Sequence, residues 1–246
     1  GITCFIILTL FVLDEFGYDS QNANSDKIYR VILHMRFKGE ESTNAKTSAP
    51  LGSVLKKDLP EVLEYARLGY FGQHNLRYND KVFREGDIYT ADSTYFDLFY
   101  MPFIYGDQKN SLRHPNSIVL SETASKKYFG NENPVGKTLT VDGTGTYLIT
   151  GVMKDYPRKS HFSCNFLLSM STYSESSKID WLNSGYTTYL LMRKDVNIPE
   201  INNKLKGIVL KYIGPQASAA IGYSLEDFFK RGNVYSLLLQ PLTSIY

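Results

Sequence analysis

The stretch of this chain whose residue types and spacing come nearest to known chemistry runs from Gly130 to Thr138 and reads GNENPVGKT. It is close to the phosphate-binding P-loop G-x-x-x-x-G-K-[ST], in which backbone N–H groups and a lysine surround a nucleotide's phosphates. However, five residues separate the glycines where the motif has four. A short helix also precedes the segment, whereas a P-loop follows a strand and opens a helix. We therefore interpret Gly130 as a helix end and Pro134–Gly136 as a turn into a strand.

A second candidate for catalysis is a nucleophile and base side by side, Ser160 and His161, with Asp155 a few residues before them. A catalytic triad requires these groups to converge in space, and closeness in sequence does not supply that geometry. The G-x-S-x-G elbow of the α/β-hydrolases is absent from the sequence. The sequence therefore predicts no catalytic residues.

Metal and cofactor sites are not predicted either. The other histidines, His34, His74 and His114, have no second ligand-type residue at metal-site spacing. Acid pairs are present, but a hydrolase would need one carboxyl group held in an apolar pocket to raise its pKa. Solvated loops explain these pairs as well: Asp14-Glu15, Glu40-Glu41 and Glu226-Asp227.

The composition restricts the class of protein. The 246 residues suffice for one large domain or two small ones, and 43% are hydrophobic, which supports a packed core. Evenly spread charges, 27 basic and 25 acidic, predict no nucleic-acid partner. The two cysteines, Cys4 and Cys164, indicate neither a disulfide framework nor a zinc site.

The first thirteen residues, GITCFIILTLFVL, are uncharged and almost entirely apolar. They are too few to cross a bilayer, which takes about 20 residues. We interpret residues 1–15 as the end of a truncated first transmembrane helix, and a buried core helix is the alternative. The last residues, YSLLLQPLTSIY, stop inside a hydrophobic pattern. Both ends are therefore expected to be cuts in a larger protein.

The remaining pattern predicts a mixed α+β chain with many hairpins and few long helices. Tyr65–Phe71 and Asn75–Phe83 are predicted as strands, with a turn at Asn79-Asp80. Lys38–Thr47 is predicted as a polar turn. The clearest helix opens at Asn197-Ile198-Pro199-Glu200 and is expected to stop at Gly214-Pro215.

Five segments stand out by their order and spacing in the chain: LDEFGYDSQNANSDKIYRV, APLGSVLKKDLPEV, TADSTYFDLFYMPFIYGD, SIVLSETASKKYFGNENPVGKTL and TYLITGVMKDYPRKSHF. Together they resemble the FtsX-like ABC transporter permeases of the Bacteroidetes type. The resemblance covers most of residues 2–166. The resemblance implies a MacB-like periplasmic core domain, with a porter-type α/β subdomain and an inserted, strand-rich Sabre-type subdomain. The porter-type part would be residues 25–76 plus 160–246, and the insert residues 77–159.

The same resemblance implies a function. Such a domain transmits ATP-driven conformational change across the membrane, a mechanism called mechanotransmission, for efflux, lipoprotein release or control of cell-wall hydrolases. ATP hydrolysis would belong to a separate ABC ATPase subunit. The implied partners are that subunit, a second permease copy in a homo- or heterodimer, and a periplasmic or outer-membrane partner or cargo. The protein would be anchored in the inner membrane with this domain in the periplasm, and no cofactor is expected.

Two other readings remain open at this point. The chain could be the ligand-sensing ectodomain of a membrane receptor, which shares an apolar start and an α+β composition. It could also be a secreted hydrolase, in which case Ser160, His161 and an acid would converge in a pocket.

Overall fold

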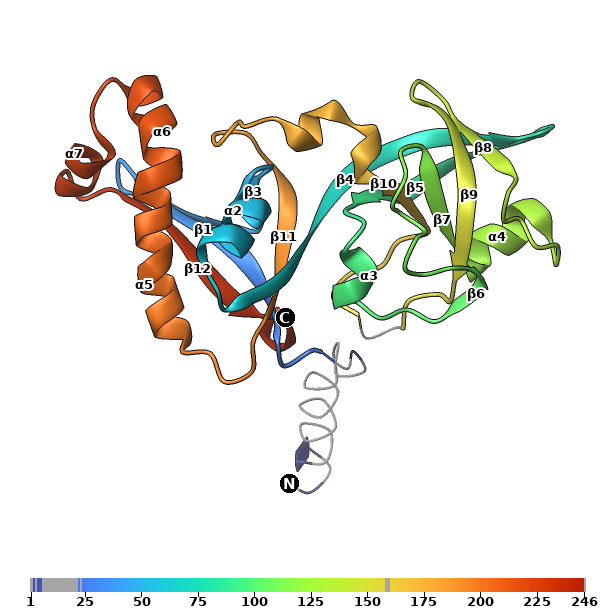
Figure 1. Ribbon diagram of the computed structural model, residues 1–246, viewed down its shortest axis with the longest axis horizontal. Coiled ribbons are helices and arrows are strands. Elements are labelled where there is room, and N and C mark those ends of the chain that lie inside the picture. The colour runs from blue at the N-terminus through green and yellow to red at the C-terminus, as the bar shows by residue number, and fades with distance from the viewer. Residues whose placement is uncertain (1, 3, 6–21, 23, 158–159, 246) are drawn as a thin grey trace.

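Twelve β-strands form one mixed sheet in the computed structural model, which describes residues 2, 4–5, 22, 24–157 and 160–245 (Figure 1). The main path through the sheet is β12-β1-β11-β4-β5-β10-β7-β9-β6, and β2, β3 and β8 pair beside it. Most of the helices are short, so the predicted α+β class is confirmed.

One half of the sheet, here called the open half, is antiparallel and has free edges. Its strands come from opposite ends of the chain: Tyr29 in β1 is paired with Pro241 in β12, and Ile28 with Leu191 in β11. The open half comprises β1 (Ile28–Phe37), β2 (Glu40–Asn44), β3 (Lys46–Ser48), β11 (Ser184–Met192), β12 (Val234–Pro241) and the first part of β4 (Val62–Tyr78). The predicted turn at Lys38–Thr47 is wrong beyond Gly39, because β2 pairs with β1 and β3 with β11.

Helices cover one face of the open half. They are α2 (Leu51–Asp58), α5 (Ile198–Ile208), α6 (Gly214–Ile221) and α7 (Leu225–Lys230). Apolar residues of α5, including Ile201 and Leu205, share a buried cluster with Val31 of β1 and Leu190 of β11. The helix spacing seen in the sequence therefore packs against the sheet, as an amphipathic helix does.

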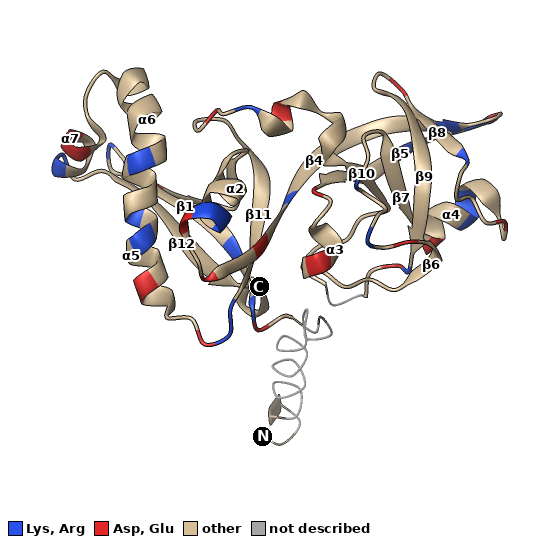
Figure 2. Cartoon of the chain, viewed as in Figure 1, with Lys and Arg blue, Asp and Glu red and all other residues tan. Residues whose placement is uncertain are grey.

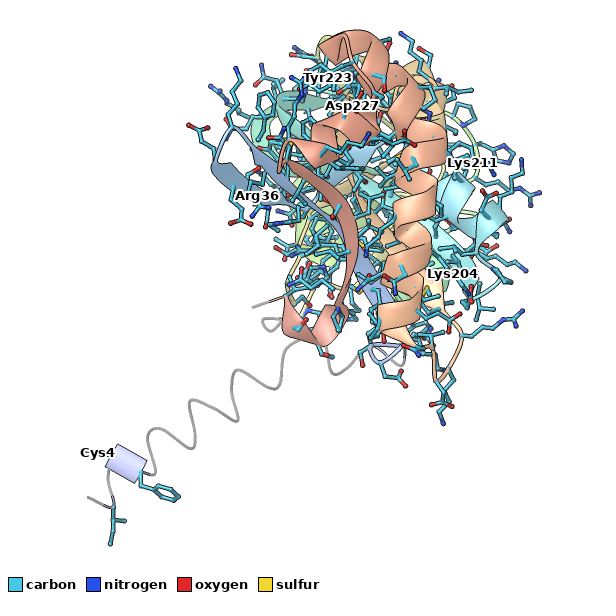
Figure 3. All side chains as sticks on the ribbon, turned by 90° about the vertical axis from the view of Figure 1, so that its left-hand side faces the viewer. Cys4, Arg36, Lys204, Lys211, Tyr223 and Asp227 are labelled. Atoms are coloured by element: carbon cyan, nitrogen blue, oxygen red, sulfur yellow. The ribbon has the colours of Figure 1, made fainter. Side chains whose placement is uncertain are left out.

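The predicted stop at Gly214-Pro215 is wrong. The helix continues from α5 through one π-helical segment, η3 (Val209–Ile213), into α6 and ends at Gly222 with φ +81°. Proline lacks an N–H and crowds the preceding turn of a regular helix. The wider π-helical turn immediately before it accommodates Pro215, so the two helices form one rod (Figure 3).

The other half of the sheet closes on itself. Strand β4 pairs with β5, β5 with β10, β10 with β7, β7 with β9, β9 with β8, and β8 returns to β4. We call this closed ring the barrel half. Its further strands are β5 (Lys81–Ala91), β7 (Ser117–Ser121), β8 (Thr138–Val141), β9 (Gly145–Met153) and β10 (Phe166–Ser169). Strand β6 (Phe103–Gly106) pairs with the end of β9, beyond the residues of β9 that pair with β8.

The interior of the barrel half is an apolar core. Inward side chains such as Leu76, Ile149 and Phe166 are fully buried in one cluster. Helix α4 (Glu122–Phe129) adds Tyr128 and Phe129 to the same cluster. Alternating inward and outward residues along each strand thus fill the barrel with side chains.

Strand β4 belongs to both halves. One of its edges pairs first with β11, up to Gly69, and later with β8, at Leu76 and Arg77. Between these pairings the register with β5 shifts twice, around Gly72, whose φ is +94°. Bulges bend a strand and increase its twist, which turns β4 out of the open sheet and into the barrel. The sequence predicted two strands in this region, Tyr65–Phe71 and Asn75–Phe83. The first of them and the beginning of the second belong to the single strand β4, and the hairpin turn at Asn79-Asp80 is confirmed.

Two smaller segments complete the junction between the halves. Helix α3 (Tyr95–Leu98) packs into a third apolar cluster that contains Ala66 of β4 and Tyr189 of β11. Residues 170–183, here called the strap, link β10 to β11 through two 3-10 turns, η1 (Met170–Thr172) and η2 (Ser174–Ser177), and span the two halves (Figure 1). The last turn, η4 (Leu242–Ser244), follows β12.

Most of the segment predicted as the end of a transmembrane helix, residues 1–15, lies outside the described residues. Within the part of the chain that the structure describes, no helix has the length and apolar character needed to cross a membrane.

Candidate functional site

A buried ion pair lies where the open half meets the barrel half. Arg67 in β4 and Asp92, just after β5, form it with a distance of 2.8 Å between Nη2 and Oδ1. Nε and the backbone N–H of Arg67 both donate to Oδ2, each at 2.8 Å. Only about a tenth of the Arg67 side chain is exposed. A fork-shaped guanidinium and a carboxylate can bond in two places at once, which fixes their orientation.

Arg67 also holds two other segments. Its Nη1 donates to the carbonyl oxygens of Ala49, just before α2, and of Ser176 in the strap, both at 2.7 Å. One side chain therefore joins β4, the end of β5, the start of α2 and the strap. A buried guanidinium needs partners for its donors, and these carbonyls supply them.

The groups around Arg67 keep its guanidinium positively charged. Burial lowers the pKa of the Arg67 guanidinium, but the hydrogen bonds and charge of Asp92 outweigh it, so the pKa is raised. Burial raises the pKa of the Tyr65 phenol, and the charge of Asp92 raises it further. Burial likewise raises the pKa of Tyr186, whose ring lies 5.5 Å from the Arg67 guanidinium. The arginine thus stays charged between two neutral phenols.

Above the ion pair lies a cavity of about 690 Å³, here called the junction cavity. Arg67 and Asp92 line it together with the start of α2 and the loop before β7, and the strap covers it. The strap is held at its far end as well: the N–H of Trp181 donates to Gln216 of α6 at 2.7 Å, and its ring packs on Tyr212 with centroids 5.5 Å apart.

Close packing between α2 and β4 shapes one wall of the junction cavity. A Cβ atom added to Gly52 of α2 would lie 2.3 Å from Cδ2 of Tyr65. The helix can therefore lie directly on the ring only because this position is glycine. The Tyr65 ring also lines the cavity.

The P-loop-like segment has the local structure predicted for it. Helix α4 comes first and ends at Gly130, with φ +63°, and β8 begins at Thr138. The turn between them includes Gly136 at φ +89°. The Nζ of Lys137 donates a hydrogen bond to the carboxylate of Glu132 and also lies beside the Phe129 ring. The element order is thus the reverse of a phosphate-binding loop.

Ser160, His161 and Asp155 all line a second cavity of about 320 Å³ beside α3. Asp155 and His161 each bond a residue outside this group of three. The Asp155 carboxylate accepts from the N–H and hydroxyl of Thr123 at the start of α4, at 3.0 and 2.7 Å. Nε2 of His161 is 2.7 Å from the Tyr189 hydroxyl. These contacts tie Asp155 to the start of α4 and His161 to β11.

The other histidines lie apart from one another. His34 contacts Glu41 on β2 at 3.0 Å, and His74 stacks on Phe71 with ring centroids 4.6 Å apart. Within the described ranges, no three or more His, Cys, Asp or Glu residues gather in a way that could hold a metal ion. Acidic and basic residues are interspersed along the chain in both halves (Figure 2).

Sequence reasoning missed Arg67 and Asp92. They are 25 positions apart, and no spacing motif links them. One signal was available: Arg67 stands in the strand segment EYARLGYF between the apolar Ala66 and Leu68. A charged residue whose strand neighbours are both apolar often has a buried partner, but the identity of that partner requires the fold.

The open sheet, the barrel and the bent strand between them define an α+β domain of the type found in the periplasmic regions of ABC transporter permeases. The family model described as the MacB-like periplasmic core domain matches residues 1–208. The chain belongs to the MacB-like periplasmic core domain family. No curated protein matches the chain in sequence.

Solved structures share this fold. A domain of a permease protein from Porphyromonas gingivalis aligns with a TM-score of 0.75 at 22% identity, over 91% of this chain and 92% of that one. The periplasmic region of MacB from Actinobacillus actinomycetemcomitans aligns at 0.58 and 16% identity, over 92% and 94%. The extracellular domain of the ABC-type transporter YknZ from Gram-positive bacteria aligns at 0.53 and 14%, over 80% and 95%.

The chain is therefore the periplasmic domain of a MacB-like or FtsX-like ABC transporter permease, and this family is not a catalytic one. The resemblance noted in the sequence is confirmed. Membership in a family of permease domains favours that reading over a receptor ectodomain or a secreted hydrolase.

Proposed function

We propose that this domain carries out mechanotransmission: it converts ATP-driven movement of the membrane helices into movement outside the membrane. The work done there would be efflux, lipoprotein release or control of cell-wall hydrolases. ATP would be hydrolysed by a separate ABC ATPase subunit. The permease would act as a homo- or heterodimer in the inner membrane, with this domain in the periplasm and a periplasmic or outer-membrane partner or cargo.

The observation that carries this proposal is the continuity of β4. The strand leaves the open sheet and enters the barrel without a loop, and Arg67 fastens both halves to it. At the far side of the open sheet, the start of β1 and the end of β12 lie side by side, with Tyr29 opposite Pro241. We expect a displacement applied at that edge to reach the barrel through the hydrogen-bonded strands and the continuous β4.

We further propose that the two halves correspond to the two subdomains expected from the family, a porter-type unit (residues 25–76 plus 160–246 by sequence) and a Sabre-type insert (residues 77–159 by sequence), with both boundaries shifted. The pairing of β10 with β5 and β7 supports placing the second boundary after Ser169, since that strand is part of the barrel. The first boundary would fall within β4, near Gly72.

Double electron–electron resonance on the full-length permease, reconstituted with its ATPase subunit, tests this function. Spin labels would replace Lys206, exposed on α5, and Asp80, exposed at the tip of the β4–β5 hairpin, in a Cys4→Ser background. We expect the distances between labels, within one copy or between two, to change between the nucleotide-free and ATP-bound states. Distributions that stay identical in every nucleotide state would contradict mechanotransmission by this domain.

A further inference from the structure

The junction cavity has the size and composition of a ligand site. Its volume of about 690 Å³ lies within the range of roughly 300–1,000 Å³ that is usual for sites of small organic molecules. Aromatic side chains from the open half and from the strap line it: Tyr65, Tyr173, Trp181 and Tyr212. Such surfaces bury the apolar body of a ligand, whereas a few polar groups orient it.

The charges that line the junction cavity are unequal. Three cations line it, Arg67, Arg113 and Lys178, against one acid, Asp92. Both carboxylate oxygens of Asp92 already accept hydrogen bonds from Arg67. The acid is therefore neutralised inside the site and has no strong attraction left for a cationic ligand.

Arg113 is the cation available for a ligand. Lys178 forms an ion pair with Glu175 on the exposed side of the strap. For Arg113, the described residues supply only Asn110 Oδ1, at 3.4 Å from Nη1, and no carboxylate within ion-pair distance. Its backbone is held in place, because the preceding Leu112 is buried and its carbonyl accepts from Ser169 Oγ at 2.8 Å.

We propose that the junction cavity binds a carboxylate-bearing molecule with an apolar body, whose carboxylate contacts Arg113 and whose body lies against Trp181 and the neighbouring tyrosines. A guanidinium suits a carboxylate because it can donate two parallel hydrogen bonds. The bound molecule would contact the strap, β4 and α2 at once, at the place where Arg67 joins the two halves. This inference does not depend on the mechanotransmission role, and its test needs no ATPase and no membrane.

Trp181 provides the measurement, since it is the only tryptophan in the 246-residue chain and lines the cavity. Decanoate is the probe, titrated while Trp181 emission is recorded, and binding heat is measured separately by calorimetry. Decanol has the same tail without a charge and serves as the ligand control. We expect saturable binding of decanoate that changes Trp181 emission, and at least tenfold weaker binding of decanol.

Two variants make the test specific. Arg113→Gln is expected to weaken decanoate binding by about tenfold or more, since a charge-assisted hydrogen-bond pair is lost. Lys109→Gln removes an exposed cation from the same loop but not from the cavity, and should bind as the parent does. The proposal is overturned if decanoate produces no saturable signal, if it binds with heat but without a change in Trp181 emission, or if Arg113→Gln binds it as tightly as the parent.

Discussion

The two halves of this domain bury their apolar faces in different ways. The barrel half closes its strands into a ring, so its inner face needs only α4 as a cover. The open half keeps its sheet edges and relies on the α5–α6 rod, which arrives from the far end of the chain. Closure removes unpaired edges, whereas an open sheet leaves an outer strand such as β12 accessible on one side.

This difference suggests a division of mechanical roles. A ring of paired strands deforms less easily than an open sheet whose cover is made of separate helices, so we expect the barrel to move as a body and the open half to adapt. Strand β4 and the Arg67–Asp92 pair connect the open half to the barrel half. The following variants probe the barrel core, the junction, the helix caps and the ion pairs in turn.

The largest effect is expected inside the barrel. Phe166→Ala removes a fully buried ring from β10 and should lower the free energy of unfolding by about 3–5 kcal/mol, since a cavity remains in a core that cannot collapse. Urea denaturation measures the change. Phe37→Ala, at a partly exposed ring that stacks on Phe228 in the open half, is the control and should cost clearly less. Equal losses would remove the proposed contrast in packing.

The next largest effect is expected at the junction between the two halves. Arg67→Met leaves the largely buried Asp92 carboxylate without its guanidinium and should lower the free energy of unfolding by about 3 kcal/mol. Asp92→Leu on the same background removes the stranded charge and should restore part of that loss. A double-mutant cycle by urea denaturation gives the coupling between the two residues. A coupling energy near zero would show that the pair does not hold the halves together.

Helix caps test the same interaction in the two halves. Ser121 Oγ accepts from the N–H of Ala124 at 3.1 Å and donates to Asn165 Oδ1, in a buried setting of the barrel. Asn197 Oδ1 accepts from Glu200 N–H at the exposed start of α5, at 3.3 Å. We expect Ser121→Ala to cost about 2 kcal/mol and Asn197→Ala about 1, because only the first leaves buried polar groups unpaired. The reverse order in thermal or urea unfolding would contradict the difference in burial.

The smallest expected effect is a loss of stability at low pH. Asp58 on α2 accepts hydrogen bonds from Lys211 and Tyr212 on η3, which lower the pKa of its carboxyl below its usual value. A group with a lowered pKa in the folded state stabilises the protein above its unfolded value, and this contribution is lost as pH falls through the folded pKa. Stability of the parent should therefore fall below about pH 4 more steeply than that of Asp58→Asn.

Denaturation at two salt concentrations gives the check on that interpretation. The difference between the parent and Asp58→Asn should shrink at high salt, because exposed ion pairs are screened. A parent and variant with parallel pH profiles would show that this pair does not tie the rod to α2.

The sequence predicted local structure well where the cause was local. The turn at Asn79 and the helix end at Gly130 depend on positive φ angles at those residues, which the local sequence favours. It predicted a helix stop at Pro215 that does not occur, because a π-helical segment absorbs the proline. The family resemblance and the α+β class were also accessible, since the ordered segments are contiguous in the chain.

By itself, then, the sequence determined that Gly130–Thr138 is a helix end, a turn and a strand start, since spacing and element order are local properties. It also determined the family. Only the tertiary structure decided that β8 returns to β4 and closes a barrel, and that Arg67 meets Asp92 beneath a cavity that Trp181 lines. The physical reason is that strand pairing and side-chain convergence join residues far apart in the chain, and no local pattern specifies which distant partner is chosen.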